Sequence, residues 1–130
     1  MRYFVEPSPD PPYEGYIDTY KSNLNITGLG NVNIFLYGME GYADPHFHIK
    51  DNSGNDICII ELCNNKYIKG GKLNNIQCSE LYNWLKSTDI EHLSKYSHWK
   101  NMIITWNMSE GNYTTNEYKI CNMPDYTNIY

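Results

Sequence analysis

The segment Pro45-His46-Phe47-His48-Ile49 is the one local stretch of the sequence whose residue types have chemical character. On a β-strand, residues i and i+2 point to the same face, so His46 and His48 would project side by side, about 6–7 Å apart along the strand. Phe47 and Ile49 would take the opposite face and anchor the strand in the core. Two imidazoles at that spacing can share a metal ion, hold an anion when protonated, or act as an acid–base pair.

An acid–base pair of this kind suits a small nuclease or phosphodiesterase, with or without assistance from a metal. His46 and His48 would then be catalytic, and Lys50, on the same face, would stabilise negative charge in the transition state. A metal site needs a third and usually a fourth ligand, and no further candidate has diagnostic spacing. The candidates by position are Asp44, Asp56, Glu61, Cys58, Cys63 and His98. We therefore predict no metal and no cofactor.

The competing interpretation of the histidines is structural, with both rings hydrogen-bonded to the preceding Gly-rich loop and to neighbouring backbone. Two known histidine patterns are also incomplete. A histidine-triad hydrolase needs a third histidine where this chain has Lys50, and a two-histidine phosphoesterase needs two separate His-x-Ser/Thr boxes, of which only His92-Leu93-Ser94 is present. The tryptophans, at helical spacing, are interpreted as core residues rather than as a ligand-stacking set. They are Trp84, Trp99 and Trp106.

The charge and cysteine content limit the classes of function. The net charge is −5, and the only arginine is Arg2, which argues against a dedicated nucleic-acid binder. The N-terminal residues contain no apolar segment typical of a secretory signal, and no apolar run approaches the about 20 residues of a membrane span. The sequence therefore predicts a cytoplasmic protein without membrane contact, in which all four cysteines are free thiols. Abundant Asn, Tyr, Ile and Lys suggest an AT-rich phage or bacterial source.

The pattern of strands and turns predicts an antiparallel meander. Residues 32–37 alternate with period two, Pro45 opens a strand over 46–50, and a turn-rich segment leads to a strand over 56–62. A further strand is expected over 66–69, closed by two glycines. Because the connections are short, neighbouring strands should be antiparallel, giving a sheet of about four strands.

Helical spacing begins after Leu73, with Asn74 or Asn75 as the cap and Cys78, Leu81, Tyr82 and Leu85 on one face. Residues 88–91 have the form of a capping box, and Ser97 can cap a last helix. We predict one α+β domain over 1–130, in which the sheet packs against two or three C-terminal helices. Its parts are an irregular N-terminal extension with short strands (1–31), the sheet (32–70), the helices (74–110) and a tail (111–130).

From Asn33 to Asn107 the order of features resembles a small bacterial and phage family, domain of unknown function 4160. The shared features are an aromatic strand (Ile34-Phe35-Leu36-Tyr37), the Pro-His-Phe-His box (45–48), Gly71-Lys72-Leu73, Trp84-Leu85 and Trp106-Asn107. The resemblance implies a compact α+β domain, and some relatives lie in gene pairs of toxin–antitoxin layout. The chain departs from the pattern in its first thirty residues, in its tail and in Ala43-Asp44 before the box.

The leading functional hypothesis is a non-enzymatic binding protein of phage or mobile-element type that docks on a host or viral protein. Tyrosine and asparagine give adaptable contact surface, so the tyrosine-rich ends of the chain are the expected binding residues. They are Tyr13, Tyr16, Tyr20, Tyr113 and Tyr118, with Tyr126 and Tyr130. The alternative is that these tyrosines cover the sheet. The rival hypothesis is the histidine-dependent enzyme centred on His46 and His48.

Overall fold

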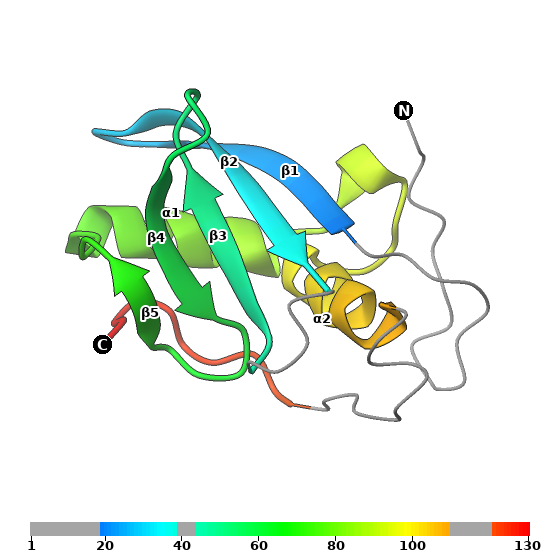
Figure 1. Cartoon of the computed structure of the whole chain (residues 1–130). Helices are drawn as coiled ribbons and strands as arrows, with labels where there is room; N and C mark the ends of the chain where they lie inside the picture. The colour runs from blue at the N-terminus through cyan, green and yellow to red at the C-terminus, as the bar shows by residue number, and fades with distance from the viewer. Residues whose placement is uncertain (1–18, 39–43, 110–120) are drawn as a thin grey trace.

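The computed structural model of the chain describes residues 19–38, 44–109 and 121–130. Within these ranges the strands are β1 (Thr19–Ile26), β2 (Gly30–Tyr37), β3 (His46–Lys50), β4 (Asp56–Glu61) and β5 (Tyr67–Gly70). They are followed by α1 (Asn75–Lys86), a 3-10 turn η1 (Ile90–His92) and α2 (His98–Met108). The strands form one antiparallel sheet in the order β1-β2-β3-β4-β5, so the predicted α+β meander with C-terminal helices is confirmed (Figure 1).

The first strand lies where the sequence predicts an irregular extension. Thr19–Ile26 is a full eight-residue strand that pairs with all of β2, from Thr19 opposite Tyr37 to Ile26 opposite Gly30. The expected Gly-rich turn closes this hairpin, and Gly28 has a positive φ of 84°, a conformation that glycine adopts without steric cost. The alternation of β1 escapes the sequence pattern because Asn23 and Asn25, which favour turns, occupy its exposed positions.

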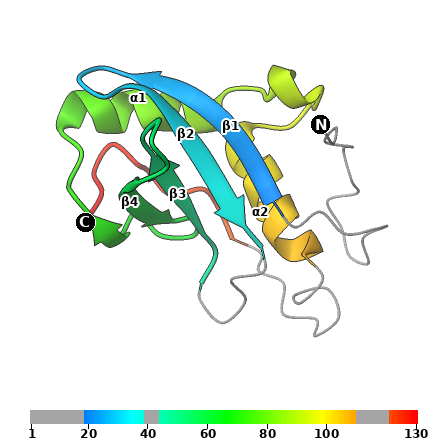
Figure 2. The ribbon, with the colours of Figure 1, turned by 45° about the horizontal axis from the view of Figure 1, so that its top comes forward.

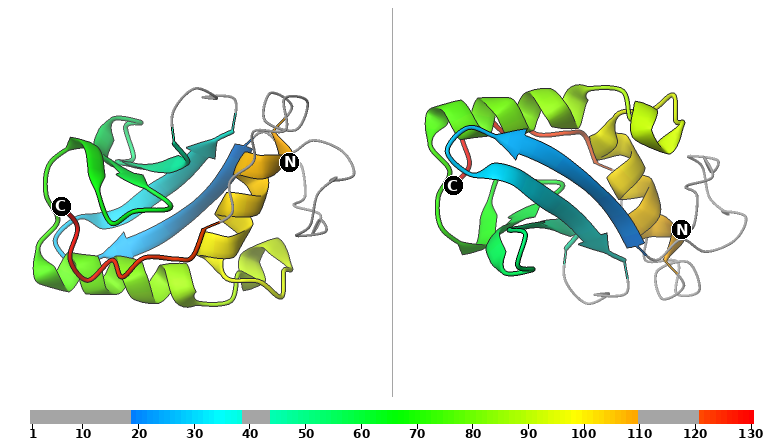
Figure 3. Two further views of the ribbon diagram at one scale, coloured as in Figure 1. Left: turned by 90° about the horizontal axis from the view of Figure 1, so that it is seen from below. Right: turned by 90° about the horizontal axis from the view of Figure 1, so that it is seen from above.

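One face of the sheet carries the core, and both helices pack on it. Period-two alternation buries Ile34 on β2, Phe47 and Ile49 on β3, and Cys58 and Ile60 on β4. Figure 3 shows α1 and α2 lying along the same side of the sheet, with α2 crossing the end of β1 and β2. The tilt of the strands relative to one another is clearest in Figure 2. The opposite face of the sheet carries the imidazoles of β3.

The two helices begin at the predicted residues. Asn74 caps α1 through a complete capping box, because its side chain accepts from the Gln77 amide while the Gln77 side chain accepts from the Asn74 amide. Ser97 caps α2 by accepting from the Lys100 amide. The predicted end of the second helix at Gly111 lies outside the described residues, and α2 as described ends at Met108.

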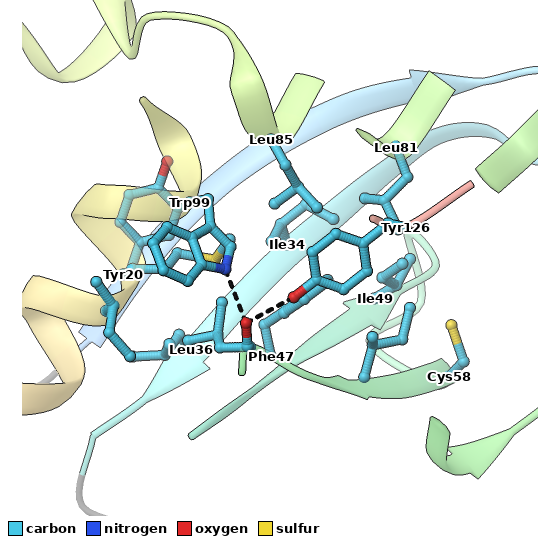
Figure 4. Packing of buried hydrophobic residues seen from close by; sticks show 14 of the residues in the cluster. Tyr20, Ile34, Leu36, Phe47, Ile49, Cys58, Leu81, Leu85, Trp99 and Tyr126 are labelled. Atoms are coloured by element: carbon cyan, nitrogen blue, oxygen red, sulfur yellow. Dashed lines mark hydrogen bonds between the residues drawn. The ribbon is translucent and has the colours of Figure 1, made fainter. Parts of the chain in front are cut away.

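The carbonyl oxygen of Leu62, the residue directly after β4, accepts two hydrogen bonds inside the core (Figure 4). The Trp99 indole donates to it at 2.9 Å, and the Tyr126 hydroxyl donates to it at 2.8 Å. These bonds satisfy a carbonyl that burial would otherwise leave without a partner, at a cost of about 1–3 kcal/mol. They also join α2 and the C-terminal residues to the sheet. Tyr126 is therefore a core residue, and its predicted role as a surface contact is wrong.

Two cysteines form a disulfide, which corrects the prediction of four free thiols. Cys63, just after β4, is bonded to Cys121, 58 residues further on. Only Cys58 and Cys78 are free, and both are buried. The sequence gives no sign of this pair, because the two residues meet only when the C-terminal segment returns to the sheet. Among the described residues, no helix has the length and apolar character needed to cross a membrane.

Candidate functional site

The histidine box adopts the predicted geometry. His46 and His48 lie on one face of β3 with ring centroids 5.4 Å apart, while Phe47 and Ile49 are fully buried on the other face. The His46 Nδ1 donates to the carbonyl oxygen of Asp44 at 2.9 Å. This bond fixes the ring against Asp44, two residues before His46. The expectation of a Pro-initiated strand with paired imidazoles is confirmed.

His48 belongs to a small polar group with Lys50 and Asp56. Asp56 Oδ1 lies 3.1 Å from His48 Nδ1 and 2.9 Å from Lys50 Nζ. Burial alone would raise the pKa of Asp56, but the hydrogen bonds from Lys50 and His48 outweigh that effect and lower it. An ionised carboxylate on Nδ1 orients the imidazole and leaves the lone pair of a neutral ring on Nε2. That arrangement is the one a general base or a metal-binding histidine uses.

Aromatic rings surround the histidines. Tyr37 meets His48 edge-on at 5.3 Å, and Trp106 meets His46 edge-on at 5.5 Å. The two histidines are 5% and 8% exposed, respectively. Among the described residues, no group of three or more His, Cys, Asp or Glu side chains is placed to hold a metal ion. His46 and His48 therefore have the chemistry that proton transfer needs. Both rings are buried, however, and this limits the contact that a substrate can make with them.

Within the described residues, the tyrosines predicted to bind a partner do not form a common exposed surface. Tyr20 is 1% exposed and points into the helix-bearing side of the sheet, so its predicted role as an exposed contact is wrong. Tyr13, Tyr16, Tyr113 and Tyr118 lie outside the described residues. Tyr130, at the end of the chain, is exposed.

A second polar cluster, which the sequence analysis missed, surrounds Asp89. Its carboxylate is completely buried and accepts from the Tyr20 hydroxyl at 2.8 Å and from the Asn101 amide at 3.0 Å. His92 Nδ1 lies 2.8 Å from its other oxygen, and His98 Nε2 lies 3.4 Å from the same oxygen. In the sequence, residues 88–91 have the form of a capping box, which indicates a helix start rather than a buried cluster. In the structure the Asp89 side chain makes no cap hydrogen bond to η1 and belongs to the buried cluster instead.

The Asp89 carboxylate is ionised because its partners outweigh its burial. Burial would raise its pKa, but hydrogen bonds from His92, Asn101 and Tyr20 lower it to about 2. The same contact, led by the hydrogen bond to Asp89, raises the pKa of His92. A buried charge with this many partners fixes the chain around it. It joins β1, the loop between the helices and α2 at one point.

The 89–94 turn, which begins at this carboxylate, presents apolar side chains to solvent. Ile90 is 74% exposed and Leu93 is 83% exposed. Leu93 has φ 55°, and it is the one non-glycine residue with a positive φ in the part of the chain that the structure describes. The left-handed region costs an L-residue about 1–2 kcal/mol. Figure 3 shows the turn projecting at the corner between α1 and α2.

Several hydrogen bonds hold the base of the 89–94 turn in place. Thr88 and Ser97 form an antiparallel bridge, and the Asp89 amide donates to the Tyr96 carbonyl at 2.8 Å. Across the turn, the Leu93 amide donates to Ile90 at 2.9 Å. The Ser22 hydroxyl of β1 donates to Glu91 at 2.9 Å. The exposed side chains thus stand on a turn with a defined shape.

Comparison of the chain with known protein families, with curated proteins and with solved structures finds no match in any of the three. The resemblance to domain of unknown function 4160 therefore stays a prediction.

Proposed function

We propose that this chain is a non-enzymatic interaction protein that docks on another protein through the 89–94 turn. The observation that carries the proposal is the exposure of Ile90 and Leu93 on a turn pinned by the buried Asp89 carboxylate. Exposed apolar side chains lower the solubility of a protein and mark interaction sites. A strained backbone is kept where function requires its shape. A preformed turn also loses little conformational entropy on binding.

The chemistry of the partner follows from the side chains of the turn. Ile90 and Leu93 require an apolar pocket, and the exposed Glu91 between them favours a basic group at its rim. The net charge of −5 favours a basic partner surface in the same way. In the phage or mobile-element setting expected from the composition, the partner would be a host or viral protein.

The test compares the double substitution Ile90→Ser, Leu93→Ser with the matched control Ile76→Ser. Ile76 is also strongly exposed, at 62%, but lies on the first turn of α1. A partner recovered in stoichiometric amount with the wild type and the control, then purified, should bind the double variant at least about tenfold more weakly by titration calorimetry. Equal affinity for all three proteins, or no stoichiometric partner, would reject the proposal.

The second candidate function is a histidine-dependent nuclease or phosphodiesterase. The contact of His48 with Asp56, beside Lys50 and His46, favours it, because an oriented imidazole, a cation and a second imidazole can serve acid–base cleavage of a phosphodiester. The burial of both rings counts against it.

This candidate is tested on the purified protein with an RNA oligonucleotide and an aryl phosphodiester, with and without Zn²⁺ or Mn²⁺. The double variant His46→Ala, His48→Ala is the comparison, and circular dichroism checks its fold. Hydrolysis by the wild type that the folded variant loses would establish the enzyme and displace the docking proposal as the main function. Equal rates would end the enzymatic interpretation.

The cytoplasmic location predicted from the sequence remains a proposal. The Cys63–Cys121 disulfide is an observation that argues against this location. Cytosolic proteins rarely keep structural disulfides, because glutathione and thioredoxin reduce them. In the cytoplasm this pair would be reduced or would change with the redox state of the cell. Rapid alkylation of cells expressing the protein, followed by mass spectrometry of Cys63 and Cys121, measures which state is present.

A further inference from the structure

The last ten residues form a strap across one end of the sheet. This C-terminal strap (residues 121–130) runs beside α1, drawn in red in Figure 3. At its start, Cys121 is bonded to Cys63. In its middle, the buried Tyr126 donates to the carbonyl oxygens of Glu61 and Leu62, both at 2.8 Å. The strap is therefore fixed at the end of β4 by one covalent bond and one buried hydroxyl group.

The end of the strap is held by the connection between β4 and β5. The Tyr67 amide donates to the Tyr130 carbonyl at 2.7 Å, and the Tyr130 amide donates to the Asn65 carbonyl at 2.9 Å. The Asn65 side chain also donates to the carbonyl oxygens of Asp125 and Asn128. These are short, partly exposed contacts, and groups of this kind open locally at small free-energy cost.

A free thiol lies directly beneath the strap. Cys78, on the inner face of α1, is 3% exposed. Its sulfur donates to the Leu73 carbonyl at 3.8 Å. The Ile129 backbone also faces the sulfur, and the Ile129 side chain packs against the core. Burial raises the pKa of Cys78, which keeps the thiol protonated and slow to react. The strap is therefore one of the elements that cover this thiol, together with Leu73 and Tyr67.

We propose that the Cys63–Cys121 disulfide is a redox switch that controls whether the C-terminal strap stays on the sheet. A dithiol reductant attacks the disulfide and passes through a mixed disulfide. The two cysteines gain two electrons and two protons, and the reductant becomes a disulfide. After reduction the strap is held by Tyr126, by the Asn65 side chain and by the backbone contacts of Tyr130. Without the covalent bond its opening costs less free energy, so Cys78 is uncovered more often. This switch is independent of the docking function.

The test is the rate at which N-ethylmaleimide labels each cysteine, followed by mass spectrometry. Cys58 is the internal reference, because it is a free thiol buried in the sheet and burial raises its pKa to about 12. In the oxidised protein we expect slow labelling of both Cys58 and Cys78. Reduction with dithiothreitol should speed labelling of Cys78 at least about tenfold while Cys58 stays slow.

Two variants test the roles of the disulfide and of Tyr126 separately. Cys63→Ser, Cys121→Ser should show fast labelling of Cys78 without reductant. Tyr126→Phe keeps the disulfide and the ring, so it should keep Cys78 protected when oxidised and label faster than the wild type when reduced.

Three results would overturn the switch. Slow labelling of Cys78 in the reduced wild type would mean that the strap does not open. Equal acceleration of Cys58 and Cys78 would mean that the whole domain opens instead. Labelling of Cys63 and Cys121 in the air-oxidised protein without reductant would mean that the disulfide is not formed.

Discussion

The hydroxyl group of Tyr20 donates a 2.8 Å hydrogen bond to Oδ2 of Asp89, joining two buried residues that are 69 positions apart in the sequence. Tyr20 belongs to β1, at one edge of the sheet, and Asp89 opens the 89–94 turn. The bond therefore ties the turn that we propose as a docking element to the sheet. Burial and the nearby carboxylate raise the pKa of Tyr20, so it acts as a donor throughout the physiological range.

Replacement of Asp89 by Asn should destabilise the protein by about 2–4 kcal/mol, because a neutral amide cannot match the charge of His92 and cannot accept from every donor around it. Urea unfolding of the purified variant measures the change. The matched control is Glu91→Gln, an exposed residue of the same turn whose carboxylate accepts from Ser22. The amide oxygen of Gln can keep that hydrogen bond, so this change should cost less than about 1 kcal/mol. Similar losses in the two variants would show that the buried carboxylate does not hold the turn.

Stability should depend on pH through the Asp89–His92 pair. The raised pKa of His92 gives stability that is complete below its usual value of 6.5 and lost as pH rises through its higher folded value. The lowered pKa of Asp89 gives stability that is present above 3.8 and lost as pH falls towards about 2. The contribution of the pair is therefore greatest between pH 3.8 and 6.5.

Thermal unfolding across this range measures the effect, with His92→Gln as the comparison. The variant should be less stable than the wild type at pH 5.5, and the difference should shrink as pH rises above the folded pKa of His92. The other groups that face Asp89 are Tyr20 of β1 and His98 and Asn101 of α2. A difference that does not change with pH would mean that His92 acts through packing alone.

The histidine box and the helix caps could be predicted because their signals are local. Pro45 disfavours a helix that runs through it, and the alternation of Phe47 and Ile49 with the histidines sets the faces of β3. Asn74 and Ser97 stand directly before helical spacing. Each of these features is decided by residues within a few positions of one another. A single sequence is enough to place them.

The Asp89 cluster and the disulfide could not be predicted in this way. The chemistry of Asp89 depends on Tyr20, and Cys63 finds Cys121 58 residues away, so neither pairing leaves a local pattern. The sequence predicts Tyr20 as a surface contact because it belongs to the tyrosine-rich ends of the chain and tyrosine gives adaptable contact surface. Its burial follows from the pairing of β1 with β2, which aligns it with Leu36.

Gly70 should not tolerate a side chain. It has φ 100°, and a Cβ there would lie 2.6 Å from Cys58 Cα. Gly70→Ala should therefore destabilise the protein by about 3 kcal/mol or more, through backbone strain and displacement of β4. The neighbouring Gly71 is the matched control, because nothing lies within 4 Å of a Cβ at that position. Chemical denaturation should show a change below about 1 kcal/mol for Gly71→Ala, and equal effects would contradict the predicted close approach.

Leu93→Asn should separate stability from docking. Asparagine adopts the left-handed region more easily than leucine, so at φ 55° the variant should be about 0.5–1 kcal/mol more stable than the wild type. Little burial is lost, because Leu93 is 83% exposed. Loss of the apolar side chain should nevertheless weaken partner binding at least about tenfold. Urea unfolding and calorimetric titration with the purified partner measure the two quantities. A variant that is more stable and binds equally well would show that Leu93 is strained without serving the interaction.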